Sequence, residues 1–423
     1  AGGIFIKRSF NDNEVYKAAL RQYISYLMEK RFPLTWSFEG TRSRLGKLMP
    51  PKYGVLKYVL EGCYYAEAHD IHIIPVTVSY DLVRDAEEYA REQAGVPKAP
   101  ESLGWLVGYI RSLAKPMGKI YVDFGEPVVL ANAPDPSDRL AISKVAFQVA
   151  VEANRVTPIT VPAVISMVLL GVYPRALSEQ EISTEVAELL DWTRQRELRL
   201  SQDFDQQYAE GMENLLDLMI GEGIVARFDG GPTTVYGLKE GRAAVASYYR
   251  NTIVHYFVNK AIAELCLVAV AEQEESDEAP SDIFWREVDD LRDLLKFEFF
   301  YPPTEVFHAE IVKELDAITP DWQEELDRGA RGARKLLLQM TPQTAHMTLQ
   351  MFVEAYAIGA EILTAVLPGE SIDESDYVVR CMNYGQQAFM QRRISSEVSA
   401  SKLLFQNCWK LLGARGLTDE SKP

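Results

Sequence analysis

The chain has 423 residues, of which 47% are hydrophobic and 25% are charged, and 61 acidic against 44 basic residues give a formal net charge of −17. This composition is typical of a folded, soluble protein, and it excludes a disordered chain, a collagen and a polytopic membrane bundle. The length predicts two or three domains, each large enough to bury its own core without disulfides or structural metals.

Residues 1–150 alternate between strand and helix patterns. Strands are expected at 4–10, 34–38, 71–80 and 119–124, and helices at 13–30, 52–69 and 105–113. The almost uncharged segment 71–80 is typical of an interior strand of a largely parallel sheet. We therefore predict an α/β domain over residues 1–150, with a mixed, largely parallel sheet and flanking helices, and we expect the chain to begin inside that domain.

The segment from Val156 to Pro174 is uncharged and includes the apolar run VPAVISMVLLGVY. One interpretation is a segment that inserts into a membrane or lies at its surface. The other is a buried helix with Thr160 as its N-cap and Pro162 in its first turn, and we favour this second interpretation.

Residues 178–250 have the pattern of a winged-helix-like segment. Helices are expected at 179–190, 194–200 and 208–221, and a hairpin with a Gly-Gly turn follows within 224–238. Such modules often bind DNA, but acidic residues outnumber basic ones here. We therefore expect a structural or docking role and no nucleic-acid partner.

Helical patterns dominate the rest of the chain and predict a large, mainly α-helical C-terminal domain over residues 151–423. The acidic stretch 272–282 is expected to be a solvated loop. The four cysteines have no CxxC spacing, which argues against a zinc ribbon or a disulfide framework and favours a reducing, cytoplasmic compartment. They are Cys63, Cys266, Cys381 and Cys408.

Two segments near the beginning of the chain carry candidate chemistry. Lys7 and Arg8, followed by Ser9, end the first predicted strand, and the loop WSFEGTRSRLGK over residues 36–47 follows the second. Ligands of open α/β sheets bind at the carboxyl ends of strands. Arg42 offers a planar set of donors for a phosphate, with the hydroxyls of Thr41 and Ser43 beside it. Either segment alone could be a solvated basic loop, whereas together they can form a phosphate site.

Three sequence blocks occur in order, about thirty residues apart: GGIFIKRSF, FEGTRSRLGK and IIPVTVSYD. They resemble the second, third and fourth blocks of the glycerol-3-phosphate acyltransferases of the bacterial membrane-bound type and their mitochondrial relatives. The later stretches YYRNTIVH, residues 248–255, and LLKFEFFY, residues 294–301, also resemble the larger members of that family. The resemblance covers most of the chain.

The resemblance implies transfer of a fatty acyl group from acyl-CoA or acyl carrier protein, as co-substrate, to the sn-1 hydroxyl of glycerol 3-phosphate, giving lysophosphatidic acid. It implies that the substrate phosphate is held by basic and hydroxyl side chains, namely Lys7, Arg8, Arg42 and Ser43, and that Ser9 is also a substrate-binding residue. It further implies that Glu39, Gly40 and Thr41 shape the glycerol site and that Pro75 forms part of the acyl-side wall. No metal or redox cofactor is implied.

The family's first block is a histidine followed, after four residues, by an aspartate, which act as general base and its orienting group. None of the five histidines of this chain has an aspartate at that spacing. We therefore expect both catalytic residues to lie upstream of residue 1, and this chain alone to be inactive. The pair His69 and His72 is more simply structural than a metal site.

Two other functions remain open from the sequence. One is acylation of dihydroxyacetone phosphate, which carries a similar phosphate and hydroxyl. The other is a noncatalytic acidic adaptor built on the winged-helix-like segment. For Arg250 and Asn251 the sequence leaves open a role at the acyl donor or an interdomain ion pair.

The resemblance and a lipid product together imply association with a membrane surface, at the cytoplasmic face of a bacterial plasma membrane. Because the net charge would oppose an anionic lipid surface, contact is expected through a local apolar or basic patch. The candidate segments are 156–174 and the basic, aromatic stretch from Trp105 to Lys119.

Overall fold

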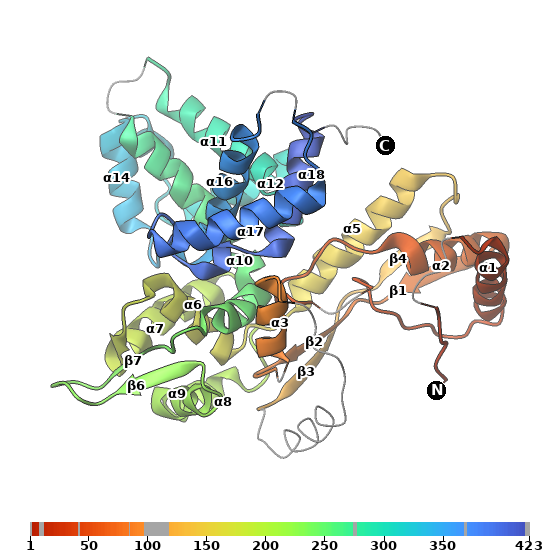
Figure 1. Ribbon diagram of the computed structural model, residues 1–423, viewed down its shortest axis with the longest axis horizontal. Coiled ribbons are helices and arrows are strands. Elements are labelled where there is room, and N and C mark those ends of the chain that lie inside the picture. The colour runs from red at the N-terminus through yellow and green to blue at the C-terminus, as the bar shows by residue number, and fades with distance from the viewer. Residues whose placement is uncertain are drawn as a thin grey trace. The chain divides into compact units, whose positions relative to one another are not determined.

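The computed structural model describes residues 2–7, 12–40, 43–83, 85–96, 118–273, 277–367 and 370–418 (Figure 1). Contacts divide the chain into two compact units. The N-terminal unit comprises residues 1–43, 48–77 and 122–156, and the helical unit comprises residues 44–47, 78–121 and 157–423. This division differs from the predicted boundary after residue 150, because two segments of the first 150 residues belong to the helical unit.

The N-terminal unit combines three helices with a pair of strands. These are α1 (Glu14–Glu29), α2 (Tyr53–Tyr65), β1 (His69–Ile73), β4 (Val128–Asn132) and α5 (Arg139–Val156). The side chain of Asn13 caps α1 by accepting a hydrogen bond from the Tyr16 amide at 2.9 Å. Apolar residues of α2 and α5, including Leu60 and Val145, form a core with Ile73 of β1.

The strands correct part of the predicted α/β architecture. Segment 71–80 is two strands, β1 and β2 (Val76–Tyr80), because Pro75 lies between them and has no N–H to donate to a ladder. β1 pairs antiparallel with β4, and β2 pairs with β3 (Ile120–Phe124). The β1–β4 pair is therefore not part of a parallel sheet, and the described residues 4–7 and 34–38 form no strand.

In the helical unit, residues 177–238 fold into helices and a small sheet. The elements are β5 (Leu177–Ser178), α7 (Glu179–Gln195), α8 (Phe204–Ala209), α9 (Met212–Gly221), β6 (Val225–Phe228) and β7 (Val235–Leu238). The strand order β5-β7-β6 is antiparallel throughout. The first helix begins at a capping box formed by Ser178 and Glu181. We infer from this order of elements that the segment is winged-helix-like.

Helix α6 (Val161–Val172) resolves the two interpretations of segment 156–174. Every residue from Val161 to Leu169 is buried, and the helix packs in one core with residues of α7, α9 and α10, such as Ile182, Leu216 and Ile253. Pro162 lies in the first turn, as expected. The buried-helix interpretation is therefore confirmed.

The rest of the helical unit is arranged around α10 (Ala243–Glu272), which contacts α6, α3 (Ala86–Gln93), α11 (Pro280–Leu294), α12 (Thr304–Asp316), α14 (Ala330–Gln339) and α15 (Ala345–Thr348). The remaining elements are α13 (Trp322–Leu326), α16 (Gln350–Thr364), α17 (Glu374–Met390), the 3-10 helix η1 (Glu397–Ser399) and α18 (Lys402–Ala414). Figure 1 shows α16, α17 and α18 side by side.

Helix α10 packs against other helices on nearly all sides, and its apolar residues are accordingly spread around the whole helix. Within the described part of the chain it is the one helix whose length and composition would allow it to cross a membrane, and 67% of its most apolar window is buried inside the unit. Burial of that extent is typical of a core helix.

Candidate functional site

The third sequence block begins in a turn that Glu39 and Gly40 shape. The Gly40 amide donates to the Ser37 carbonyl at 3.2 Å, and the φ of Gly40 is 64°, in the left-handed region that glycine tolerates best. The Glu39 side chain is buried, and its carboxylate accepts a hydrogen bond from the Met49 amide at 2.6 Å. Glu39 therefore supports the backbone of this loop. Thr41 and Arg42 lie outside the described residues.

The other predicted site residues contact different neighbours. The exposed Lys7 lies against α1, where its amide donates to the Tyr16 hydroxyl at 3.0 Å and its ammonium is 5.4 Å from the centre of the Tyr16 ring. Pro75 is buried, and its carbonyl accepts from the Gly125 amide at 2.8 Å. These contacts do not join one predicted site residue to another. Ser43 is half-buried, and Arg8 and Ser9 lie outside the described residues.

The block continues into the helical unit, where α10 fixes residues 44–47. The Asn251 side-chain amide donates to the Leu45 carbonyl at 2.8 Å. Gly46, with a φ of 85°, lies so close to α10 that a Cβ atom there would be 2.0 Å from the Tyr248 carbonyl oxygen. No side chain fits at that distance, so this approach requires glycine. The stretch YYRN therefore holds Leu45 and Gly46 of the third block.

Lys47 completes this attachment from inside the helical unit. Its side chain is 3% exposed, its ammonium donates to the Glu298 carbonyl at 2.7 Å, and it lies 2.9 Å from the Glu298 carboxylate. The rings of Phe299 and Phe352 are 5.5 and 5.9 Å from the ammonium. A buried ammonium needs such a partner, because an unpaired charge is costly away from water.

The Glu298 carboxylate oxygen that does not face Lys47 has hydrogen-bond donors of its own. It accepts hydrogen bonds from the Tyr356 hydroxyl and the Asn407 amide, each at 3.1 Å. Burial, together with the charge of Glu298, raises the pKa of Tyr356. The carboxylate thus connects the two stretches that resemble the family, FEGTRSRLGK and LLKFEFFY, to α16 and α18.

Arg250 does not form the interdomain ion pair that was one of the two roles left open by the sequence, since its partners among the described residues are neutral groups. It is buried, and its guanidinium donates to the Met347 carbonyl at 2.6 Å, the Ser247 hydroxyl at 2.9 Å and the Asn251 side-chain oxygen at 2.8 Å. These partners are neutral, and burial lowers the pKa of Arg250. Arg250 therefore fixes α10 to α15 and orients Asn251 toward Leu45.

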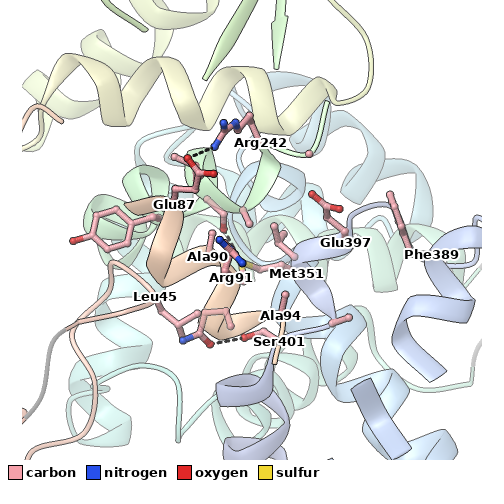
Figure 2. A pocket seen from close by; sticks show the side chains of 18 of the residues that line it. Leu45, Glu87, Ala90, Arg91, Ala94, Arg242, Met351, Phe389, Glu397 and Ser401 are labelled. Carbon is pink, nitrogen blue, oxygen red and sulfur yellow. Dashed lines mark hydrogen bonds and ion pairs between the residues drawn. The ribbon is translucent and has the colours of Figure 1, made fainter. Parts of the chain in front are cut away.

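A pocket of about 650 Å³ lies beside this attachment, entirely within the helical unit (Figure 2). It is lined by residues of α3, α10, α16, α17 and the segment around η1, and by Arg44 and Leu45 of the third block. Arg44 forms an ion pair with Glu92, and Arg242 forms one with Glu87 at 2.8 Å. The sequence did not predict the pocket because its wall comes from six separate segments.

Three of the histidines contact a nearby polar side chain. His69 contacts the Asn132 side chain at 2.7 Å on β1 and β4, and His72 contacts Asp70 at 3.1 Å. His308 lies 2.7 Å from Asp289 on the exposed surface of α11 and α12, with its ring 4.7 Å from that of Trp285. Over the ranges that the structure describes, no three His, Cys, Asp or Glu side chains gather as a metal site would require.

Both parts of the chain match known protein families. Residues 89–421 match the family model described as the glycerol-3-phosphate acyltransferase C-terminal region, and residues 1–79 match an acyltransferase family model. A protein of Mycobacterium tuberculosis, named as a candidate acyltransferase, plsB1, is 33% identical over 424 residues, which is 99% of this chain and 68% of that protein. Mycobacterium bovis has a protein of the same name and the same identity.

A protein of Pasteurella multocida named glycerol-3-phosphate acyltransferase is 28% identical over 276 residues, covering 61% of this chain and 34% of that protein. The match to the C-terminal family model alone extends over most of the chain and contains the elements that hold residues 44–47. On these grounds the chain belongs to the glycerol-3-phosphate acyltransferase family.

Proposed function

We propose that this chain forms the substrate-binding and helical parts of an enzyme that acylates glycerol 3-phosphate. The acyl group comes from acyl-CoA or acyl carrier protein, the acceptor is the sn-1 hydroxyl, and the product is lysophosphatidic acid. The observation that carries the proposal is the presence, in one chain, of an acyltransferase region over residues 1–79 and the family's C-terminal region over 89–421.

Charge and hydrogen-bonding capacity support a phosphate site in the two basic segments. A phosphate dianion in a partly desolvated site needs more than one cation. Lys7, Arg8 and Arg42 supply cations, and Ser9 and Ser43 supply hydroxyl donors. The ordered turn at Glu39 and Gly40 supports a role for these residues and Thr41 in shaping the glycerol site, and Pro75 is proposed for the acyl-side wall.

The reaction proposed is a direct transfer. The acceptor oxygen attacks the thioester carbonyl carbon, the C–S bond breaks, the thiol leaves, and a general base takes the hydroxyl proton. We assign the base to the histidine of a His and Asp block outside the given sequence, so this chain alone is proposed to lack activity. The residues of this chain bind and orient the acceptor, and we propose no metal or redox cofactor.

The helical unit supports this function by holding the residues that directly follow the phosphate-binding part of the third block. Arg44 to Lys47 are fixed by Glu92, Asn251 and Glu298. Fixing the end of a binding loop limits its conformational freedom, which lowers the entropic cost of binding. This gives the C-terminal region a direct role in acceptor binding.

We also propose that the enzyme works at the cytoplasmic face of a bacterial plasma membrane, because its product is a lipid. The segment 156–174 is not proposed for membrane contact, since α6 is buried. Of the other candidate, Trp105 to Lys119, the part up to Met117 lies outside the described residues.

An acyl-transfer assay tests the function. Radiolabelled palmitoyl-CoA is incubated with glycerol 3-phosphate, dihydroxyacetone phosphate or glycerol, using this chain and a form extended upstream to include the His and Asp block. We expect lysophosphatidic acid from glycerol 3-phosphate in the extended form alone. A clear preference for dihydroxyacetone phosphate would make that molecule, and not glycerol 3-phosphate, the acceptor. Failure of the extended form to acylate any acceptor would overturn the proposal.

A further inference from the structure

The 650 Å³ pocket of the helical unit has the size and lining of a small-molecule site, for which about 300–1,000 Å³ is usual. Its apolar wall contains three methionines, and the side chains are Val245, Met351, Met382, Phe389, Met390 and Val398. Methionine is unbranched, flexible and polarizable, so a methionine-rich wall adapts to the different lengths and bends of a flexible apolar ligand. The wall therefore suits a hydrocarbon chain.

Three charged side chains that line the pocket, Glu240 among them, have no hydrogen-bond or ion-pair partner within the described residues. The other two are Arg91 of α3 and Glu397 of η1, and Figure 2 shows them around the same space as Met351. Arg44 and Arg242, by contrast, are paired with carboxylates. Arg91 is exposed at the pocket wall, so its guanidinium is available to an oxygen-bearing end of a ligand.

The environment of Glu397 agrees with an apolar occupant. Burial raises the pKa of this carboxyl.

The pocket is also linked along the chain to the proposed acceptor site. Arg44 and Leu45, which line it, directly follow Ser43 of the third block. Both residues are fixed to the helical unit, by Glu92 and Asn251. The part of the block that carries the phosphate-binding residues is thus covalently continuous with one wall of the pocket.

We propose that this pocket binds the hydrocarbon chain of a long acyl group, with Arg91 and Glu397 at its polar end. The inference rests on the proposed function, and it assigns acyl-chain recognition to the helical unit. Two molecules share this chemistry, the acyl thioester donor and the acylated glycerol phosphate product, and the experiment separates them.

The test fills the pocket and measures binding directly. Ala94 is an exposed alanine that lines the pocket at the end of α3, and Ala360 is an exposed alanine of α16 that does not. Ala94→Trp, the matched control Ala360→Trp and the charge variant Arg91→Gln are titrated by calorimetry, below micelle concentrations, with palmitoyl-CoA, palmitoyl lysophosphatidic acid, octanoyl-CoA and free CoA. Thermal unfolding monitors the fold of each variant.

We expect Ala94→Trp to weaken binding of a palmitoyl probe by about tenfold or more, because several methylene groups lose contact with apolar surface. Octanoyl-CoA and free CoA should change far less, Arg91→Gln should weaken the palmitoyl probes, and Ala360→Trp should leave all four unchanged. If Ala94→Trp weakens binding of palmitoyl-CoA alone, the pocket binds the donor, and if it weakens binding of the lysolipid alone, the pocket binds the product. If it weakens binding of both, the pocket accepts either molecule. Equal palmitoyl binding by folded Ala94→Trp and Ala360→Trp overturns the proposal.

The extended, active form distinguishes this failure from failure of the proposed function. If Ala94→Trp acylates glycerol 3-phosphate with an unchanged preference for palmitoyl over octanoyl donors, the pocket assignment is wrong and the function stands. If no form acylates glycerol 3-phosphate while Ala94→Trp still weakens palmitoyl binding, the pocket assignment stands and the function is wrong.

Discussion

The ammonium of Lys47 lies 2.9 Å from the carboxylate of Glu298, and the two side chains are only 3% and 0% exposed. This pair attaches the last residue of the segment FEGTRSRLGK to the stretch LLKFEFFY. Two sequence blocks far apart in the chain therefore meet as one buried ion pair, with aromatic rings on the ammonium.

The first prediction concerns the stability of this pair. Lys47→Met leaves a buried, unpaired carboxylate and should lower the free energy of unfolding of the helical unit by about 3–5 kcal/mol. Lys296→Met removes a partly exposed pair with Asp293 in the same unit and should cost less than about 1 kcal/mol. Urea denaturation followed by circular dichroism measures both.

The double variant Lys47→Met/Glu298→Gln separates loss of the charge pair from loss of packing. Glutamine keeps an acceptor for Tyr356 and Asn407 while removing the charge, so the double variant should be more stable than Lys47→Met alone. Equal losses of unfolding free energy in Lys47→Met and Lys296→Met would show that the buried pair stabilises the unit no more than the partly exposed pair does.

The second prediction concerns Gly46. Gly46→Ala combines a left-handed backbone with a Cβ atom 2.0 Å from the Tyr248 carbonyl, so α10 and the third block must separate. Gly416→Ala has a similar φ, 70°, in open space, and should cost only the backbone strain, about 1 kcal/mol. We expect Gly46→Ala to be clearly less stable and, in the active form, to bind glycerol 3-phosphate more weakly. Identical melting temperatures for the two variants would contradict this contact.

The third prediction concerns thiol reactivity. All four cysteines are buried free thiols, and burial raises the pKa of each, to about 12 for Cys381 and about 11 for Cys408. Because the thiolate is the reactive form, Ellman's reagent at pH 8 should modify none of them rapidly in the folded chain and all four in denaturant. Ala360→Cys should add one fast thiol as a positive control. Rapid modification of a native cysteine would show an opening absent from this structure.

The elements with strong local sequence patterns are the ones whose positions the sequence predicts closely. The helix predicted at 13–30 is observed as Glu14–Glu29, and the strand at 119–124 as Ile120–Phe124. The buried helix predicted within 156–174 is observed as Val161–Val172, and the hairpin predicted within 224–238 is observed as β6 and β7. Each has a clear periodicity or a turn signal that needs no knowledge of distant contacts.

What the sequence could not give depends on long-range packing. The apolar composition of 71–80 concealed the interruption at Pro75, where the chain changes its pairing partner. Nothing near Gly46 indicates that α10 approaches it, because that contact joins segments about two hundred residues apart. The pocket and the neutral partners of Arg250 likewise come from separate helices. In the sequence, only the resemblance of these blocks to one protein family indicates that the segments belong together.

The steady-state kinetics of Arg42→Ala in the active, extended form test the central claim, that the third block binds the phosphate of glycerol 3-phosphate. Loss of a charge-assisted hydrogen bond of about 2 kcal/mol should raise the KM for glycerol 3-phosphate by about 30-fold. The KM for palmitoyl-CoA should stay within about twofold. Arg155→Ala, which removes a surface partner of Glu152, should change neither. An unchanged KM for glycerol 3-phosphate, or equal increases for both substrates, would contradict the account.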